Sequence, residues 1–264
     1  MQPLSFLELP AVAGEDPPPA APRRLIRSNR RRIASDRLST CLVLTVLTLT
    51  ALILPSLARA HGVAEADAAF IQQQAGVHFW PYFYLGAKHM VTGIDHLLFL
   101  AGIVFFLYRL RDVTLYVTLF ALGHSTTLIA GVWFDIPANA YLIDAIIGFS
   151  VVYKAFENLG GFEHLGWSID TRIAVAVFGL FHGFGLATKL QELSLPSDGL
   201  LTNLIAFNLG VEAGQVLALV GIVTLVNCWR FTTRFASQAA VFNSLIMSAG
   251  FVLMAYQLTG LLQA

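Results

Sequence analysis

Residues 89–108 read HMVTGIDHLLFLAGIVFFLY and decide how the chain folds. Most of these side chains are apolar, and about 20 such residues in succession are what a helix needs to cross a bilayer. The stretch nevertheless contains His89, Asp95 and His96, and ionisable groups are costly to insert into lipid. It therefore predicts a membrane-spanning helix that carries a chemical site.

The composition of the whole chain agrees with a membrane protein. Apolar residues make up 56% of the 264 residues and charged residues 12%, against about 25% charged residues in soluble domains. A soluble fold has too little interior for that much apolar surface, which excludes a soluble enzyme, a disordered chain and a nucleic-acid binder built on basic patches. The only two cysteines, Cys41 and Cys228, exclude a disulfide framework and a cysteine-based zinc site.

Five further apolar stretches have a length suited to spanning the bilayer. Helices are expected, because lipid offers no partner to open backbone groups, and the alternating pattern of a membrane barrel is absent. The predicted fold is an all-α, polytopic membrane protein whose residues 61–264 form a six-helix transmembrane bundle. After His89–Tyr108, the spans are Val113–Trp133, Ala138–Asn158, Thr171–Thr188, Leu201–Trp229 and Ala239–Leu262.

The first 60 residues are expected to lie outside this bundle. Residues 1–22 are rich in proline and alanine and are expected to be a disordered extension. Residues 23–60 combine a basic stretch, an apolar run over Leu38–Leu57 and the small-residue site Ala58-Arg59-Ala60, the three parts of a cleaved signal peptide. A retained signal anchor is the alternative, because the apolar run approaches a spanning length.

The orientation follows from the lysines and arginines near the span ends. With the mature N-terminus outside a bacterial inner membrane, only Lys88 and Lys189 lie at the outer side. The aromatic cluster Phe79–Tyr84 then marks the outer interface, or alternatively forms a substrate cage. The inner side carries Arg109, Arg111, Lys154, Arg172, Arg230 and Arg234.

Polar residues on five spans are expected to meet in one layer of the outer half of the membrane. His89 and His96 are seven residues apart, nearly two helical turns, and therefore share one helix face. Imidazole and carboxylate groups together suit nickel, cobalt, zinc, copper or iron, although a single membrane histidine can also serve only to hydrogen-bond a neighbouring helix. The predicted ligands are His89, Asp95, His96, His124, His182 and Glu212, with Ser125, Asp144, Asn208 and Gln215 in supporting positions.

These residues resemble the HupE/UreJ family, specifically its second branch. The shared motifs are His89-x5-Asp95-His96, Gly123-His124-Ser125, Phe181-His182-Gly183 and Phe207-Asn208-Leu209-Gly210-Val211-Glu212, in this order. The resemblance implies a signal peptide followed by six spans, and nickel or cobalt uptake alongside hydrogenase or urease maturation. One difference is that the nickel-permease branch has a glutamate shortly after Phe-His-Gly, where this chain has Ala187-Thr188-Lys189. The acid is therefore expected at Glu212 instead.

Three functions are consistent with this sequence. The first is a permease for a divalent transition metal, for which the expected partners are the ion, the lipid bilayer and proteins of metalloenzyme maturation, with no nucleic acid. The second is an intramembrane metal-dependent enzyme of hydrolase type, in which three histidines and an acid hold a zinc ion. The third is an assembly factor for a metalloenzyme complex, whose polar residues bind partner helices. A path for the ion to the inner side would distinguish the first from the second.

Overall fold

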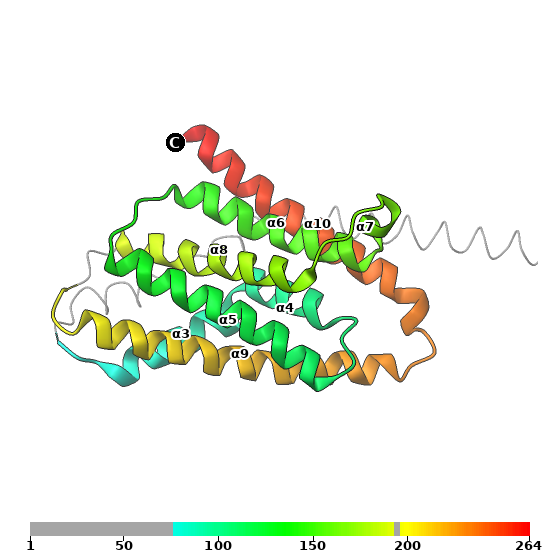
Figure 1. Cartoon of the computed structure of the whole chain (residues 1–264), viewed down its shortest axis with the longest axis horizontal. Helices are drawn as coiled ribbons and strands as arrows, with labels where there is room; N and C mark the ends of the chain where they lie inside the picture. The colour runs from blue at the N-terminus through cyan, green and yellow to red at the C-terminus, as the bar shows by residue number, and fades with distance from the viewer. Residues whose placement is uncertain (1–75, 193–195) are drawn as a thin grey trace, which may run out of the picture. The chain divides into compact units, whose positions relative to one another are not determined.

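The computed structural model describes residues 76–192 and 196–264, and the regular structure in these ranges is entirely helical. The signal peptide and the disordered extension predicted for residues 1–60 lie outside the described residues. The helices are α3 (Phe79–Thr92), α4 (Ile94–Val104), α5 (Leu110–Trp133), α6 (Ala140–Asn158), α7 (Gly161–His164), α8 (Thr171–Gln191), α9 (Leu200–Arg230) and α10 (Phe235–Gln263) (Figure 1).

Several of these helices are long and apolar enough to cross a membrane, so the chain is a multi-pass membrane protein. Among the described residues, four helices meet this criterion alone, namely α5, α8, α9 and α10, and the bent pair α3–α4 counts as a fifth span. The remaining predicted span corresponds to α6, which does not meet the criterion because it carries three charged residues, Asp144, Lys154 and Glu157. Six spans therefore remain a prediction.

The first predicted span differs from the observed structure. The sequence predicts one helix over His89–Tyr108, whereas α3 already begins at Phe79 and is separated from α4 by Gly93, with a bend of 63° between them. Gly93 has an extended backbone, with φ −69° and ψ 105°, and glycine is a poor residue for the middle of a helix. The aromatic cluster Phe79–Tyr84, assigned to the segment before the span, forms the first turns of α3.

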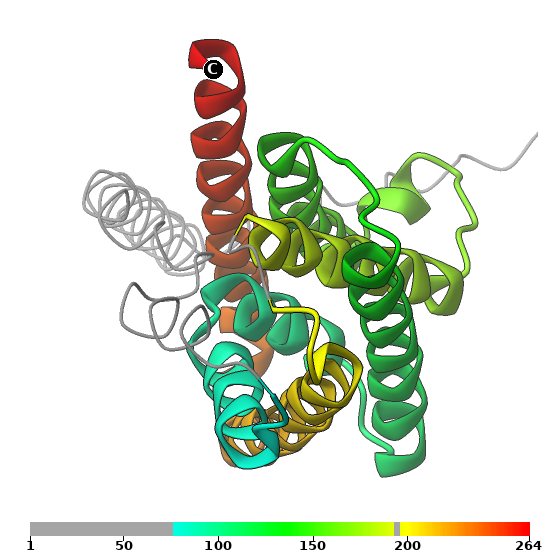
Figure 2. The same ribbon diagram turned by 90° about the vertical axis from the view of Figure 1, so that its left-hand side faces the viewer.

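The helices associate in three close pairs, α3 with α9, α5 with α8, and α6 with α10. Figure 2 shows α3 lying along α9. Glycines permit the close approach: a Cβ atom on Gly123 would lie 2.6 Å from the Ala176 carbonyl oxygen of α8, and one on Gly148 would lie 2.6 Å from the Met254 nitrogen of α10. Small residues at such contacts are typical of helix packing in membranes.

Arg230, the last residue of α9, holds the C-terminal end of the half-helix α4. Its guanidinium donates hydrogen bonds to the carbonyl oxygens of Val104 at 2.8 Å, Leu107 at 3.0 Å and Phe105. The same group lies 4.2 Å from the centre of the Tyr108 ring. A cation at a helix C-terminus interacts favourably with the helix dipole, and this contact fixes the C-terminal end of the bent span.

Candidate metal centre

Four histidines from four helices meet around His96. The centre of the His96 ring lies 5.1 Å from that of His89, 5.9 Å from that of His124 and 5.0 Å from that of His182. His96, His124 and His182 are each at most 2% exposed, and His89 is half-buried. One ligand atom each from His89, His96 and His124 lies within 4.8 Å of the other two. We call these four side chains the histidine cluster.

The bend at Gly93 brings His89 and His96 together. The sequence places both on one face of a continuous helix, but in the structure His89 belongs to α3 and His96 to α4. A Cβ atom on Gly93 would lie 2.8 Å from His96 Nδ1 and 3.2 Å from Asp95 Oδ1, closer than ordinary contacts allow. Glycine at the bend therefore leaves space for the His96 ring and the Asp95 carboxylate.

The close contact between α5 and α8 brings the other two histidines to His96. A Cβ atom on Gly183 would collide with the carbonyl oxygen of His124, and the Thr127 hydroxyl donates to the Leu180 carbonyl oxygen at 2.6 Å. His124 is next to Gly123 and His182 next to Gly183 in the sequence. The glycines that allow the two helices to approach therefore also set the level of the two imidazoles.

Oxygen atoms lie beside two of the buried rings. His182 Nδ1 is 2.8 Å from the Phe178 carbonyl oxygen, and His96 Nδ1 is 2.9 Å from Asp95 Oδ2. Neither ring nitrogen of His124 has a hydrogen-bond partner among the described residues. Metal-binding histidines typically donate their second ring N–H to such an oxygen, whereas a buried imidazole without any partner is costly. The arrangement is therefore suited to a bound cation.

A layer of three phenylalanines closes one side of the histidine cluster. Phe99, Phe120 and Phe178 come from α4, α5 and α8, each one turn from the histidine of its helix, and all three are buried. The His182 ring lies 5.3 Å from the ring of Phe99 and 5.0 Å from that of Phe120. Sequence reasoning missed this layer, although a phenylalanine lies three or four residues from His96, His124 and His182 in the sequence.

The structure does not bring every predicted residue to the cluster. Glu212 is exposed on α9, while its neighbours Val211 and Gly214 are buried, so the expectation that it faces His182 is not met. Asp144 is buried but lies 3.7 Å from Lys189 Nζ, measured from Oδ2, in an ion pair between α6 and α8. The acid beside the histidines is Asp95.

The three predicted supporting residues that remain occupy different environments. Ser125 is half-buried on α5. Gln215 is buried, and its Nε2 atom donates to the Val117 carbonyl oxygen at 3.5 Å. Asn208 is 5% exposed, and neither its amide nitrogen nor its amide oxygen has a hydrogen-bond partner among the described residues.

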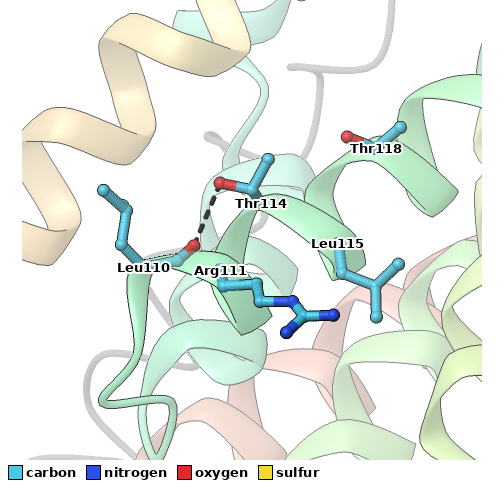
Figure 3. Close-up of a pocket in the computed structure, with 5 residues that line it drawn as sticks. All are labelled: Leu110, Arg111, Thr114, Leu115 and Thr118. Carbon is cyan, nitrogen blue, oxygen red and sulfur yellow. Dashed lines mark hydrogen bonds between the residues drawn. The ribbon is translucent and has the colours of Figure 1, made fainter.

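A surface depression at the start of α5 is separate from this site. It is lined by Leu110, Arg111, Thr114, Leu115 and Thr118 (Figure 3). These residues are exposed, and the Thr114 hydroxyl donates to the Leu110 carbonyl oxygen at 3.0 Å within the same helix. These lining residues include no imidazole or carboxylate, so the histidine cluster is the better candidate for a metal site.

Comparison with known families gives one match that covers most of the chain. The model of the family described as HupE / UreJ protein matches residues 65–263, a range that includes the whole histidine cluster. No curated protein and no solved structure matches the chain.

Proposed function

The chain belongs to the HupE/UreJ family, and on this basis we propose that it is a permease for a divalent transition metal ion, with nickel or cobalt as its substrate. The observation that carries the proposal is the triad of ligand atoms on His89, His96 and His124, which lie within 4.8 Å of one another between membrane-spanning helices. The family is associated with nickel or cobalt uptake, and imidazole is a ligand that suits these ions.

The donors around the site support binding of a dehydrated cation. His89, His96 and His124 offer three imidazole nitrogens, and His182 stands beside His96 as a fourth candidate ligand. The Phe178 carbonyl beside His182 Nδ1 favours the tautomer in which Nε2 carries the lone pair. Asp95 supplies negative charge next to His96, which partly offsets the charge of the ion. Together these groups replace the water that the ion loses on entering the membrane.

The interrupted span supports transport in particular. Transporters commonly place their binding residues beside discontinuous helices near the middle of the membrane. Here the interruption at Gly93 separates His89 from Asp95 and His96, so a change in the angle between α3 and α4 would change the distance between ligands. We infer that such a movement releases the ion, and that the phenylalanine layer must rearrange to let it pass inward.

The proposed membrane arrangement has α6 as a sixth span, residues 1–60 as extension and signal peptide, and the mature N-terminus outside a bacterial inner membrane. The excess of lysine and arginine at the predicted inner ends supports this orientation. The N-terminal ends of α3 and α9 are then on the outer side, and the Arg230 contacts with α4 are on the inner side. A partner in metalloenzyme maturation would meet the ion there.

An intramembrane metal-dependent hydrolase is the second candidate. The phenylalanine layer favours it, because a centre closed on one side suits a metal ion that stays in place and activates water. Such a zinc ion is typically held by three protein ligands, which can all be imidazoles, and its fourth position is left for water. The two functions differ in whether the ion leaves the site on the side opposite to its entry.

Uptake by vesicles containing the purified full chain tests the proposal. We expect the wild type to accumulate nickel or cobalt ions, His96→Ala to lose the uptake, and His164→Ala to retain it, because His164 is an exposed histidine on α7 outside the cluster. Binding of one metal ion without uptake would favour the enzyme. An absence of binding to the wild type would contradict both functions.

A further inference from the structure

Asn208 is a buried amide whose hydrogen-bonding capacity is unused. The residue is 5% exposed, and neither side-chain polar atom has a hydrogen-bond partner among the described residues. Leaving such a group unpaired costs free energy, because it has lost its hydrogen bonds to water. Most buried polar side chains in proteins have a partner. The exception calls for a specific explanation.

The register between α5 and α9 places Asn208 opposite His124. The two helices run in opposite directions (Figure 1), and Gln215 of α9 contacts the Val117 carbonyl of α5. Asn208 precedes Gln215 by seven residues, and His124 follows Val117 by seven residues. Seven residues are nearly two turns of helix, so both steps lead to the same level, and each keeps its helix face.

A second contact places Asn208 at the level of the histidine cluster independently. The ring of its neighbour Phe207 lies 6.2 Å from the ring of His89. His89 is in turn one of the three residues, with His124, whose ligand atoms lie within 4.8 Å of one another. Asn208 therefore lies on the side of the cluster that faces α9. This is the helix from which the sequence predicted Glu212 as a ligand.

His124 is the buried histidine of the cluster that lacks an orienting oxygen. His182 has the Phe178 carbonyl oxygen beside Nδ1, and His96 has the Asp95 carboxylate. Both nitrogens of His124, by contrast, are without a hydrogen bond to any of the residues that the structure describes. When one nitrogen of an imidazole binds a metal ion, the other carries a proton and needs an acceptor. The Asn208 amide oxygen is such an acceptor.

We propose that Asn208 is a positioning residue of the metal centre, which accepts a hydrogen bond from the ring N–H of His124 when a metal ion binds. The inference rests on the proposed function, because it assigns His124 as a ligand. The Asn208 amide does not touch the ion. It fixes the tautomer and the ring plane of His124, so that the remaining nitrogen points to the other ligands.

Titration of the purified full chain with Co²⁺, followed by the visible absorption of the bound ion, tests this role. Asn208→Leu removes the acceptor at similar volume, and we expect cobalt affinity to fall about 10- to 100-fold, as for other orienting partners of metal ligands. Asn208→Asp keeps an acceptor oxygen and should bind within a few-fold of the wild type. The matched control is Asn243→Leu, a change at another buried asparagine, which hydrogen-bonds Asn158 away from the cluster and should bind cobalt normally.

The absorption band of bound cobalt separates positioning from a general loss of structure. We expect its position and intensity to change in Asn208→Leu and to return in Asn208→Asp, with helical content unchanged in both. Should Asn208→Leu fail to fold, Asn208→Ala supplies the same comparison without added bulk. Wild-type affinity and spectrum in the Leu or Ala variant, or an equal loss in the Asp variant, would overturn the inference. Failure of the wild type to bind both Co²⁺ and Ni²⁺ would instead overturn the proposed function.

Discussion

Two buried polar regions of this molecule differ in how their hydrogen bonds are satisfied. In the region that the proposed arrangement places on the inner side, Lys154 Nζ lies 2.6 Å from Glu157 Oε2, and the Thr171 hydroxyl donates to the same carboxylate. The Asn158 amide there donates to Asn243 Oδ1 and to the Gly102 carbonyl oxygen, both at 2.8 Å. We call these five polar side chains the inner polar network. In the histidine cluster, by contrast, His124 makes no hydrogen bond among the described residues.

Burial of a polar residue in the membrane therefore does not by itself indicate a ligand site. The inner polar network joins α4, α6, α8 and α10 with groups that satisfy one another, which is how polar side chains associate helices in lipid. The histidine cluster brings together imidazole rings from four helices. Both ring nitrogens of His124 in this cluster are without a hydrogen bond among the described residues. The first region is expected to control stability, and the second to control metal binding.

His96→Ala should give the largest effect on metal binding. His96 is central, with three other imidazole rings at 5.0–5.9 Å from its own. We expect nickel binding to fall below detection in isothermal titration, while the helical content and the mobility in size-exclusion chromatography stay unchanged. Near-normal nickel affinity in this variant would show that the cluster serves helix packing, like the inner polar network.

Gly93→Ala should give the next largest effect. The added Cβ would lie 2.8 Å from His96 Nδ1, so the ring must turn away or the bend must change. We expect at least about a tenfold loss of affinity, the scale on which displacement of a metal ligand's support acts, measured by the same titration. Gly221→Ala is the control, since nothing lies within 4 Å of a Cβ atom there. Equal affinities in the two variants would exclude a role for the bend in forming the site.

Asn243→Leu should have the opposite effect to the cluster variants, because it lowers stability and leaves metal binding unchanged. Asn243 is 1% exposed and connects α10 to α6 through Asn158. Hydrogen bonds between membrane helices contribute about 0.6 kcal/mol on average and up to about 2 kcal/mol. We expect a lower midpoint of thermal unfolding in detergent and an unchanged nickel affinity. A large loss of affinity with unchanged stability would connect the inner polar network to the site.

Glu212→Gln should give the smallest effect. Glu212 is exposed on α9 and lies outside the cluster, so removal of its charge leaves the ligands in place. We expect the affinity for nickel to stay within about twofold of the wild type, which at 1.4 kcal/mol per tenfold is less than about 0.5 kcal/mol. Loss of nickel binding in this variant would support Glu212 as a metal ligand, as the sequence predicted.

The sequence predicted the membrane class and the HupE/UreJ family, because these depend on composition and short motifs. It did not predict the bend at Gly93, because other glycines of the chain, such as Gly123 in α5 and Gly183 in α8, lie within continuous helices. Nor did it show that Glu212 is exposed or that Asp144 lies near Lys189, since depth along a helix says nothing about direction around it. The pairing of α5 with α8 brings His124 and His182 together. Such a contact between separate helices cannot be predicted from local sequence patterns.

X-ray absorption spectroscopy of the nickel-loaded full chain identifies the atoms that bind the ion. If the histidine cluster holds the ion, the spectrum should show a shell of nitrogen and oxygen atoms, with the multiple scattering of at least three imidazole rings and no sulfur. His96→Ala should remove one imidazole or prevent loading, and Asn243→Leu should leave the spectrum unchanged. A nickel environment with no more than one imidazole would contradict the assignment of the metal centre to His89, His96 and His124.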